Sequence, residues 1–408
     1  MEVLYPRCAG LDVHKDVVMA CARSVVGTSA RHDIAEFSTT TAGLLALADW
    51  LKEHHSTHVA MEATGVYWKP VWHVLEGGIE LLLVNPAHAR NVPGRKSDVN
   101  DARWLADLLA HGLIRPSFVP PTPIQALRDL TRTRKQLVRQ VGRHTLRIQK
   151  TLEDANIKLT GVISDLLGTS GRAIVKALIA GETNPERLLQ HTTGLLKTPR
   201  RRLLEGLRGI VTDHHRFMLR VHLRQIEALE AGIAQLERQI TKLMRPVQSR
   251  VDLLTTIPGV SNTVAHVLVA EIGMDMARFP TPGHLVSWAG LCPRLDESAG
   301  KARSTRVRHG APWLKTTLVS AGWAAASSRG TYLRAQFQRL KTRRGPKKAV
   351  VAVAASILTA AYFILRDGVP YRDLGPDYFD RQDRTKVVRR LRRRIEALGY
   401  RVDVHQVA

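Results

Sequence analysis

The sequence predicts an α/β domain at the N-terminus, then a helical region with a coiled-coil seam, and then a mainly α-helical C-terminal domain. Three observations lead to this class: β-branched apolar runs alternate with helical spacings up to residue 120, apolar residues recur at steps of three and four around residue 235, and Ala-rich apolar segments follow residue 310. With 408 residues the chain is long enough for two or three domains with sizeable cores. The expected divisions are 1–120, 121–250, 251–370 and a basic extension, 371–408.

Charge is distributed unevenly along the chain. Lys and Arg outnumber Asp and Glu by 61 to 36, a net charge of +25, yet residues 1–120 carry −2 while 121–250 and 251–408 carry +13 and +14. This basic balance favours a polyanionic partner, either nucleic acid or an anionic membrane surface. The apolar run Ala349–Leu365 is Ala-rich and includes polar residues, so we expect a buried helix there and no membrane. The lack of an apolar signal-peptide core and three scattered cysteines favour a reducing cytoplasm.

The first module shows the element order βββαβαβα. Strands are expected at Ala9–Val13, Val17–Ala22, His32–Phe37, His58–Ala63 and Ile79–Val84, and helices at Thr41–His54, Tyr67–Glu76 and Asp98–His111. Three antiparallel strands followed by strand–helix units are the arrangement of the ribonuclease-H-like nuclease fold. Element order alone does not assign a function, which must be inferred from the residues of a site, here the acidic residues.

Four carboxylates are placed where they could converge at one edge of this sheet. Asp12 falls at the end of the first strand and Glu62 near the end of the fourth, while Asp98 and Asp101 lie three apart and so share one helix face. Clustered carboxylates repel one another unless cations neutralise them, and their hard oxygen ligands suit Mg²⁺ or Mn²⁺. Two such ions could hold the attacking and leaving oxygens of a phosphodiester. Spacing alone does not exclude Asp16 or Asp107 as members, nor a role for each acid as a surface residue or helix cap.

Several motifs together resemble one known family. They are Gly10-Leu11-Asp12-Val13-His14-Lys15, Met61-Glu62-Ala63-Thr64-Gly65-Val66-Tyr67-Trp68, Asn85-Pro86, Lys96-Ser97-Asp98-Val99-Asn100-Asp101-Ala102, Leu254-Thr255-Thr256-Ile257-Pro258-Gly259-Val260, Ser287-Trp288-Ala289-Gly290-Leu291 and Glu297-Ser298-Ala299-Gly300-Lys301. In this order they resemble the DEDD transposases of bacterial insertion sequences, recombinases with a RuvC-like domain that work with a bridge RNA. The resemblance implies a RuvC-like N-terminal domain, a C-terminal transposase domain, and acidic metal ligands at Asp12, Glu62, Asp98 and Asp101.

The resemblance also implies that Ser298 is a nucleophile. A hydroxyl that attacks a DNA phosphate forms a covalent phosphoserine, which keeps the energy of the broken bond for rejoining. The residues alone favour a polar loop at Ser298, because no histidine base adjoins it. The following cations could neutralise phosphate charge: Lys301, Arg303, Arg306 and Arg308. In the family the two sites combine between protomers, which implies a homo-oligomer here, either a dimer or a tetramer.

The middle region combines a cationic stripe with an apolar seam. The stripe recurs every three or four residues and consists of Arg128, Arg132, Lys135, Arg139, Arg143, Arg147 and Lys150. No acid lies between Thr131 and Leu152, so we expect a helix face that follows a phosphate backbone, rather than a merely solvated face. The seam consists of Ile226, Leu229, Ile233, Leu236, Ile240 and Leu243. It predicts either an intramolecular helical hairpin or a coiled coil between two chains.

The last module offers further candidates for phosphate contact. Ile257-Pro258-Gly259-Val260-Ser261 resembles a helix-hairpin-helix turn, in which Gly259 and a helix N-terminus would face a phosphate, or it is merely structural. Trp313–Ser328 and Ala349–Leu365 are expected to be buried helices separated by a basic linker, residues 341–348. The basic tail from Arg381 onward is expected to be mobile or associated with RNA.

These observations favour a divalent-metal-dependent DNA recombinase that mobilises an insertion sequence. Its expected partners are donor and target DNA and a bridge RNA, and the RNA is implied by the family resemblance. We expect the protein to be associated with the nucleoid when it acts on DNA. One alternative is a hydrolytic junction endonuclease that uses the same acids with water as nucleophile. The other is a non-catalytic nucleic-acid-binding protein, for which the acids would be dispensable.

Overall fold

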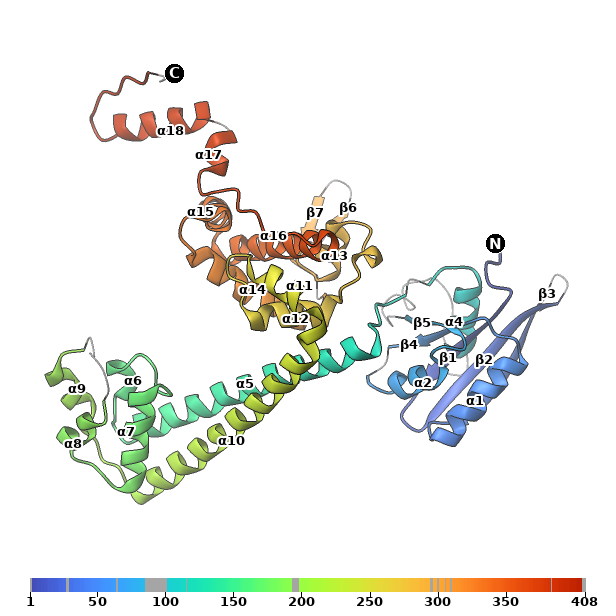
Figure 1. The fold of residues 1–408 in the computed structure, drawn as a ribbon, viewed down its shortest axis with the longest axis horizontal. Helices are drawn as coiled ribbons and strands as arrows, with labels where there is room; N and C mark the ends of the chain where they lie inside the picture. The colour runs from blue at the N-terminus through green and yellow to red at the C-terminus, as the bar shows by residue number, and fades with distance from the viewer. Residues whose placement is uncertain are drawn as a thin grey trace. The chain divides into compact units, whose positions relative to one another are not determined.

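The computed structural model describes residues 2–26, 29–63, 65–84, 101–114, 116–192, 198–293, 296–298, 301–304, 306–308, 310–382 and 384–405. The chain forms two compact units, Met1–Val119 and Pro120–Ala408. The first is the α/β domain and the second is almost entirely helical, as the sequence predicted (Figure 1). The finer division of the second unit at residues 250 and 370 stays a prediction.

The first unit contains a five-stranded mixed sheet with helices on both faces. Its elements are β1 (Arg7–Val13), β2 (Val17–Val26), β3 (Ser29–Ser38), α1 (Thr41–Glu53), β4 (His58–Glu62), α2 (Trp68–Leu75), β5 (Glu80–Val84) and α4 (Asp101–Ala110). The strand order is β3-β2-β1-β4-β5, antiparallel from β1 to β3 and parallel from β1 through β4 to β5. Alternate residues of β1 and β4, among them Leu11 and Met61, pack on α1 and α2 and form a buried core.

Helix α4 covers the opposite face of the sheet and runs antiparallel to β1. Leu4 N donates to Ala110 O at 2.8 Å, and Cys8 Sγ donates to Ala106 O at 3.5 Å. Two residues after Cys8 on the same face of β1, a Cβ added to Gly10 would lie 2.1 Å from Ala102 O. Each step along β1 therefore moves toward the start of α4, which brings the N-terminus of α4 to the end of β1. The glycine in the Gly10-Leu11-Asp12 motif is needed because the α4 backbone leaves no room for a side chain.

We expect Gly10→Ala to destabilise the first unit by about 2 kcal/mol, because an added methyl group overpacks the contact with α4. Urea unfolding followed by circular dichroism measures this change. Gly142→Ala is the control, since a Cβ there meets nothing within 4 Å and the position lies inside a helix. It should stabilise by about 0.5–1 kcal/mol. Equal unfolding midpoints for Gly10→Ala and the unchanged protein would contradict the tight seating of α4.

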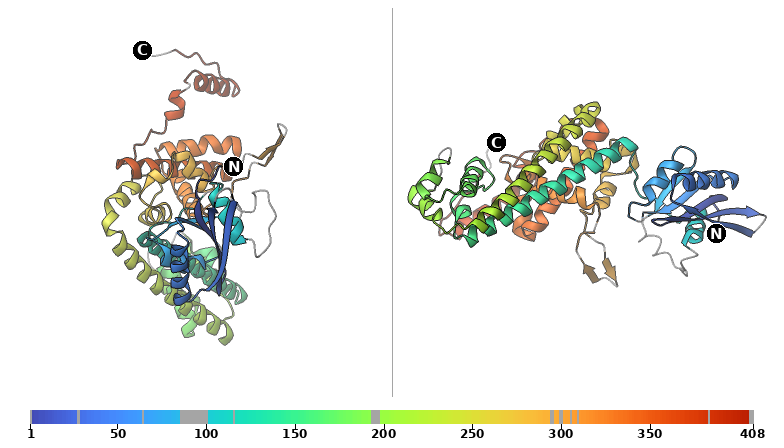
Figure 2. Two further views of the ribbon diagram at one scale, coloured as in Figure 1. Left: turned by 90° about the vertical axis from the view of Figure 1, so that its right-hand side faces the viewer. Right: turned by 90° about the horizontal axis from the view of Figure 1, so that it is seen from below.

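The second unit is built around two long helices that pair side by side (Figures 1 and 2). They are α5 (Thr122–Asp154) and α10 (Asp213–Met244). The predicted seam lies on α10 with Ile226 and Ile240 buried and the other four residues half-buried, and Gly232 of α10 lies next to Leu137 of α5. The intramolecular hairpin is therefore formed, whereas a coiled coil between two chains stays a prediction.

The two ends of this hairpin carry separate hydrophobic cores. Four short helices pack on one end: α6 (Leu159–Val162), α7 (Thr169–Ala180), α8 (Pro185–Gln190) and α9 (Arg200–Gly206). The other end packs on α11 (Gln248–Thr255), α12 (Asn262–Ile272), α13 (Pro282–Trp288), α14 (Pro312–Ser327), α15 (Tyr332–Arg344) and α16 (Pro346–Asp367), with short η2 (Arg245–Val247) and η3 (Met276–Arg278) turns. A hairpin of β6 (Asp296–Ser298) and β7 (Lys301–Ser304) stands out from these helices (Figure 2). The chain continues through α17 (Tyr378–Gln382) and α18 (Arg384–Glu396).

Helix α16 is the one helix in the described ranges that is long and apolar enough to cross a membrane. Just over half of its apolar window, 56%, is buried inside the protein, where Val353, Ile357 and Leu358 belong to the core. This confirms the expected buried helix. The predicted basic linker before it is wrong, because residues 341–344 end α15 and residues 346–348 begin α16, with Gly345 at φ 80° joining the two helices.

Candidate functional site

Two carboxylates lie side by side at one end of the sheet. Strands β1 and β4 pair in parallel, with Gly10 opposite Ala60 and Leu11 opposite Met61, so the next register position brings Asp12 beside Glu62. Side chains alternate between faces, so these two share the α4 face. Glu62 is 9% exposed and the Asp12 side chain 14% exposed. The Nε2 atom of His14 lies 3.1 Å from Asp12 Oδ2.

The third predicted acid lies at the start of α4. Asp101 is the first described residue of this helix and is half-buried. Because α4 runs antiparallel to β1, its N-terminus reaches the end of the sheet where Asp12 lies. The partial positive charge of a helix N-terminus stabilises nearby carboxylates. Asp98, the fourth predicted acid, lies outside the described residues.

The donor chemistry of this edge fits a hard divalent cation. Carboxylate oxygens are the ligands that Mg²⁺ and Mn²⁺ prefer, and largely buried acids on neighbouring strands are costly without a compensating positive charge. Within the described part of the chain, however, no three His, Cys, Asp or Glu side chains are gathered closely enough to hold a metal ion. Asp98, the remaining predicted ligand, lies outside that part.

The two competing acids have other surroundings. Asp16 is exposed in the turn between β1 and β2. Asp107 Oδ1 accepts hydrogen bonds from Arg23 Nε at 2.9 Å and lies 2.8 Å from His32 Nε2, so it ties α4 to β2 and β3. Arg23 is only 6% exposed. Asp107 is therefore occupied in holding α4 on the sheet, a role that requires partners 75 and 84 residues away and that sequence spacing did not indicate.

The two N-terminal cysteines are structural. Burial raises the pKa of Cys8 to about 11 and that of Cys21 to about 12, with Asp107 adding to the rise at Cys21. Both thiols therefore stay protonated near neutral pH, where a protonated thiol is neither a good nucleophile nor a good metal ligand.

Ser298 is the last residue of β6 and pairs with Lys301 of β7. It is thus placed at the end of a strand of the β6–β7 hairpin rather than in a helix. The backbone positions of Lys301 and Arg303 lie on β7 of the same hairpin, and Arg306 and Arg308 are exposed just after it. Cations therefore follow Ser298 in the chain, as the sequence indicated.

The residues of the cationic stripe all lie on the single helix α5, but about half of them contact other helices of the second unit. Arg132 Nε and Nη2 each donate to the Glu271 carboxylate at 2.8 Å, and Arg128 donates to Ala270 O and Glu271 O. Burial lowers the pKa of Arg128 to about 10 against the raising effect of Glu271. These contacts seat α5 on the C-terminal end of α12. The sequence did not indicate this neutralising acid, because Glu271 lies 139 residues away from Arg132 along the chain.

Lys135 and Arg139 contact α14. Lys135 Nζ donates to Trp313 O, Thr316 Oγ1 and Thr317 Oγ1, and burial together with Arg139 lowers its pKa to about 8. The Arg139 guanidinium lies 5.3 Å from the Trp313 ring centroid. The remaining stripe residues are exposed on α5: Arg143, Arg147 and Lys150. Nucleic-acid contact by the full stripe stays a prediction, and these last three are the members most accessible for it.

We expect Glu271→Gln to destabilise the second unit by about 3 kcal/mol, because two half-buried arginines lose the buried carboxylate that neutralises them. The Glu271 side chain is 1% exposed. Glu205→Gln is the control, since Glu205 pairs with Arg201 at the surface, where both side chains are more than half exposed. That change should cost less than about 0.5 kcal/mol. Guanidinium unfolding of full-length protein compares them, and equal midpoints would refute the importance of the buried ion pair.

The predicted hairpin turn at Gly259 joins α11 to α12. Gly259 has φ 85°, and a Cβ there would lie 2.5 Å from Ala321 O, so α14 packs directly on this residue. Ser261 caps α12 by accepting a hydrogen bond from Val264 N. These contacts explain both residues structurally, and contact between Gly259 and a phosphate stays a prediction.

Comparison with known proteins matches both ends of the chain. A DEDD transposase model of the IS110 type matches residues 9–157, which include Asp12, Glu62, Asp98 and Asp101. A model described as transposase of the IS116/IS110/IS902 family matches residues 251–338, which include Ser298.

Curated relatives extend this similarity over most of the chain. A probable family 20 transposase of Pseudomonas aeruginosa is 26% identical over 79% of this chain and 88% of its own length. A pilin gene-inverting protein of Moraxella bovis is 24% identical over 89% of this chain and 96% of its own. An insertion element IS110 protein of Streptomyces coelicolor is 32% identical over 35% of each chain. The chain belongs to the IS110 family of DEDD transposases, and its family implies an enzyme that cleaves and recombines DNA.

Proposed function

We propose that this transposase cuts, exchanges and rejoins DNA strands through a covalent phosphoserine at Ser298, with Asp12, Glu62, Asp98 and Asp101 as the metal-binding acids. The observation that carries the acidic half is the parallel register of β1 and β4, which puts Asp12 beside Glu62 at the edge that the start of α4 reaches. The strand order β3-β2-β1-β4-β5 supports a ribonuclease-H-like fold for this unit.

The acids would hold Mg²⁺ or Mn²⁺, which when bound would neutralise charge on the reacting phosphate. Asp12 and Glu62 are largely buried on adjacent strands, so they would position ligands with little rotation of their own side chains. Asp101 would approach from the helix above them. Ser298 Oγ would attack phosphorus, forming a phosphoserine ester while the departing sugar oxygen takes up a proton. A free 3′-hydroxyl would then attack the phosphoserine, resealing DNA and restoring the serine.

Guidance by a bridge RNA and assembly of at least a dimer complete the proposal. Both rest on the family resemblance, with the exposed cations Arg143, Arg147 and Lys150 as accessible contacts for RNA or DNA. In the dimer or tetramer, the serine of one protomer would act with the acids of another.

The test is a search for a protein-linked DNA strand. Purified protein is mixed with labelled donor and target DNA, the RNA that flanks its element, and Mg²⁺, and the products are separated on a denaturing gel. We expect a slow-migrating adduct that disappears without RNA or with EDTA and that protease converts to free DNA. Cleaved DNA without any adduct would favour the hydrolytic endonuclease instead.

A further inference from the structure

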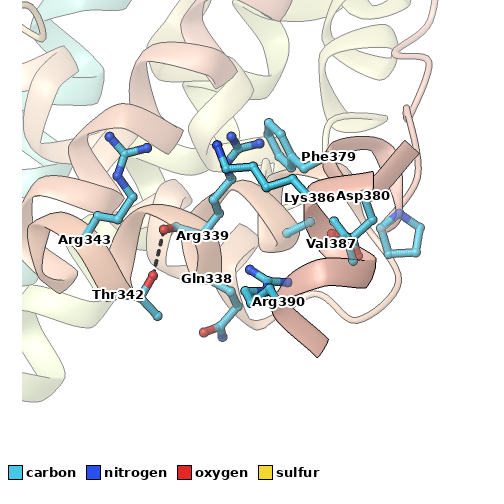
Figure 3. A pocket seen from close by; sticks show the side chains of 11 residues that line it. Gln338, Arg339, Thr342, Arg343, Phe379, Asp380, Lys386, Val387 and Arg390 are labelled. Carbon is cyan, nitrogen blue, oxygen red and sulfur yellow. Dashed lines mark hydrogen bonds between the residues drawn. The ribbon is translucent and has the colours of Figure 1, made fainter. Parts of the chain in front are cut away.

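A groove of about 720 Å³ lies between α15, α17 and α18 in the second unit (Figure 3). Arg339 and Arg343 line it from α15, and Lys386 and Arg390 line it from α18. Asp380 is the one acid that the described chain contributes to this lining. The two walls therefore present cations toward the same space.

The base of the groove is fixed by contacts with the protein body. Asp373 Oδ1 accepts hydrogen bonds from Tyr332 N at 2.9 Å and Gly375 N at 2.8 Å, which ties the segment before α17 to the start of α15. The Phe379 ring stacks on Tyr332, with centroids 5.2 Å apart, and the Arg339 guanidinium lies 4.8 Å from the Phe379 centroid. The segment at the start of the basic tail is thus packed against α15.

The charge of both walls is strongly one-sided. Helix α15 contains five Lys and Arg residues and no acid, and α18 contains seven with Glu396 as its one acid. Arg392 Nε donates a hydrogen bond of 2.7 Å to Glu396 Oε1. Arg343 and Arg390, which line the groove, are both exposed. Two facing rows of like charge repel unless a polyanion lies between them, and DNA supplies a phosphate charge about every 1.7 Å of helix axis.

We propose that the α15–α18 groove is a DNA-backbone binding site that grips phosphates without reading bases. DNA is favoured over other polyanions because the family acts on DNA and because cations from two helices can contact successive phosphates. This site goes beyond the proposed cleavage chemistry, since it needs neither the metal ligands nor Ser298. It holds DNA on the transposase by means of the C-terminal extension.

The test measures binding of a short labelled DNA duplex by fluorescence anisotropy, in EDTA and over a range of salt concentrations. The groove variant is Arg343→Gln with Arg390→Gln. Both side chains are exposed, so the fold should be retained, which circular dichroism and thermal unfolding check. The control is Arg389→Gln with Arg393→Gln, which removes the same amount of charge at exposed positions of α18 that do not line the groove. Loss of two phosphate contacts should weaken binding at least about tenfold and flatten the log–log salt slope by about 2.

Each outcome decides the proposal. A large loss in the groove variant with a clearly smaller loss in the control supports it. Equal losses in both arginine pairs would overturn it, because diffuse charge rather than the groove would then bind DNA. A variant that loses affinity only for an RNA hairpin, or only for anionic phosphatidylserine vesicles, would also overturn it in favour of that partner.

Discussion

Asp12→Asn should abolish strand cleavage, lowering its rate by at least about 1,000-fold, while leaving the fold intact. The amide keeps the shape of the side chain but removes the negative charge that would hold a cation, and metal stabilisation of a reacting phosphate contributes several kcal/mol. Asp12 is a partly buried neighbour of Glu62 on adjacent strands, so no solvent-exposed acid can readily take its place. Gel-based cleavage of labelled donor DNA measures the effect, and urea unfolding checks stability.

Asp16→Asn is the matched control for this change. Asp16 is four residues further along the chain and exposed in the next turn. Cleavage by this variant should match that of the unchanged protein. If Asp12→Asn still cleaves and recombines DNA normally, the carboxylate site is not catalytic, and the non-catalytic binding protein becomes the better hypothesis.

Ser298→Ala should eliminate the covalent protein–DNA adduct and with it strand exchange. A methyl group cannot attack phosphorus, and the loss of a single hydroxyl group is a small change for the fold. Rejoining would fall below detection, because no phosphoserine would remain to be attacked by a free 3′-hydroxyl. The denaturing gel that detects the adduct also reports free cleaved strands.

Ser304→Ala tests whether any serine of the hairpin suffices. Ser304 ends β7, and its Oγ accepts a hydrogen bond from Arg306 N. This variant should keep the adduct. Unchanged DNA cleavage in Ser298→Ala, with no adduct in either protein, would show hydrolysis by water and leave Ser298 as a loop residue.

Local patterns predicted most of the elements because short-range physics forms them. The apolar runs Ala9–Val13 and Val17–Ala22 lie in β1 and β2, and the helical spacing of Thr41–His54 is observed in α1. The position of Asp12 at a strand end and the helix predicted over Asp98–His111, which is observed as α4 from Asp101, likewise depend on local sequence. The same reasoning did not predict that the Tyr332–Arg344 helix continues through basic residues 341–344. A run of charged residues suggests a linker when the helix that packs against it is unknown.

By itself, then, the sequence determined most of the elements, the strand ends that carry Asp12 and Glu62, the helix that carries Asp101, and, through its motifs, the family. The tertiary structure decided which charges are available. Glu271 is 139 residues from Arg132 and Asp107 is 84 residues from Arg23, yet each pair is joined by a hydrogen bond of 2.8 or 2.9 Å. Such pairs form because burying one charge requires its opposite nearby, whatever their distance along the chain. Periodicity shows that a residue lies on a helix face, and only packing shows what that face meets.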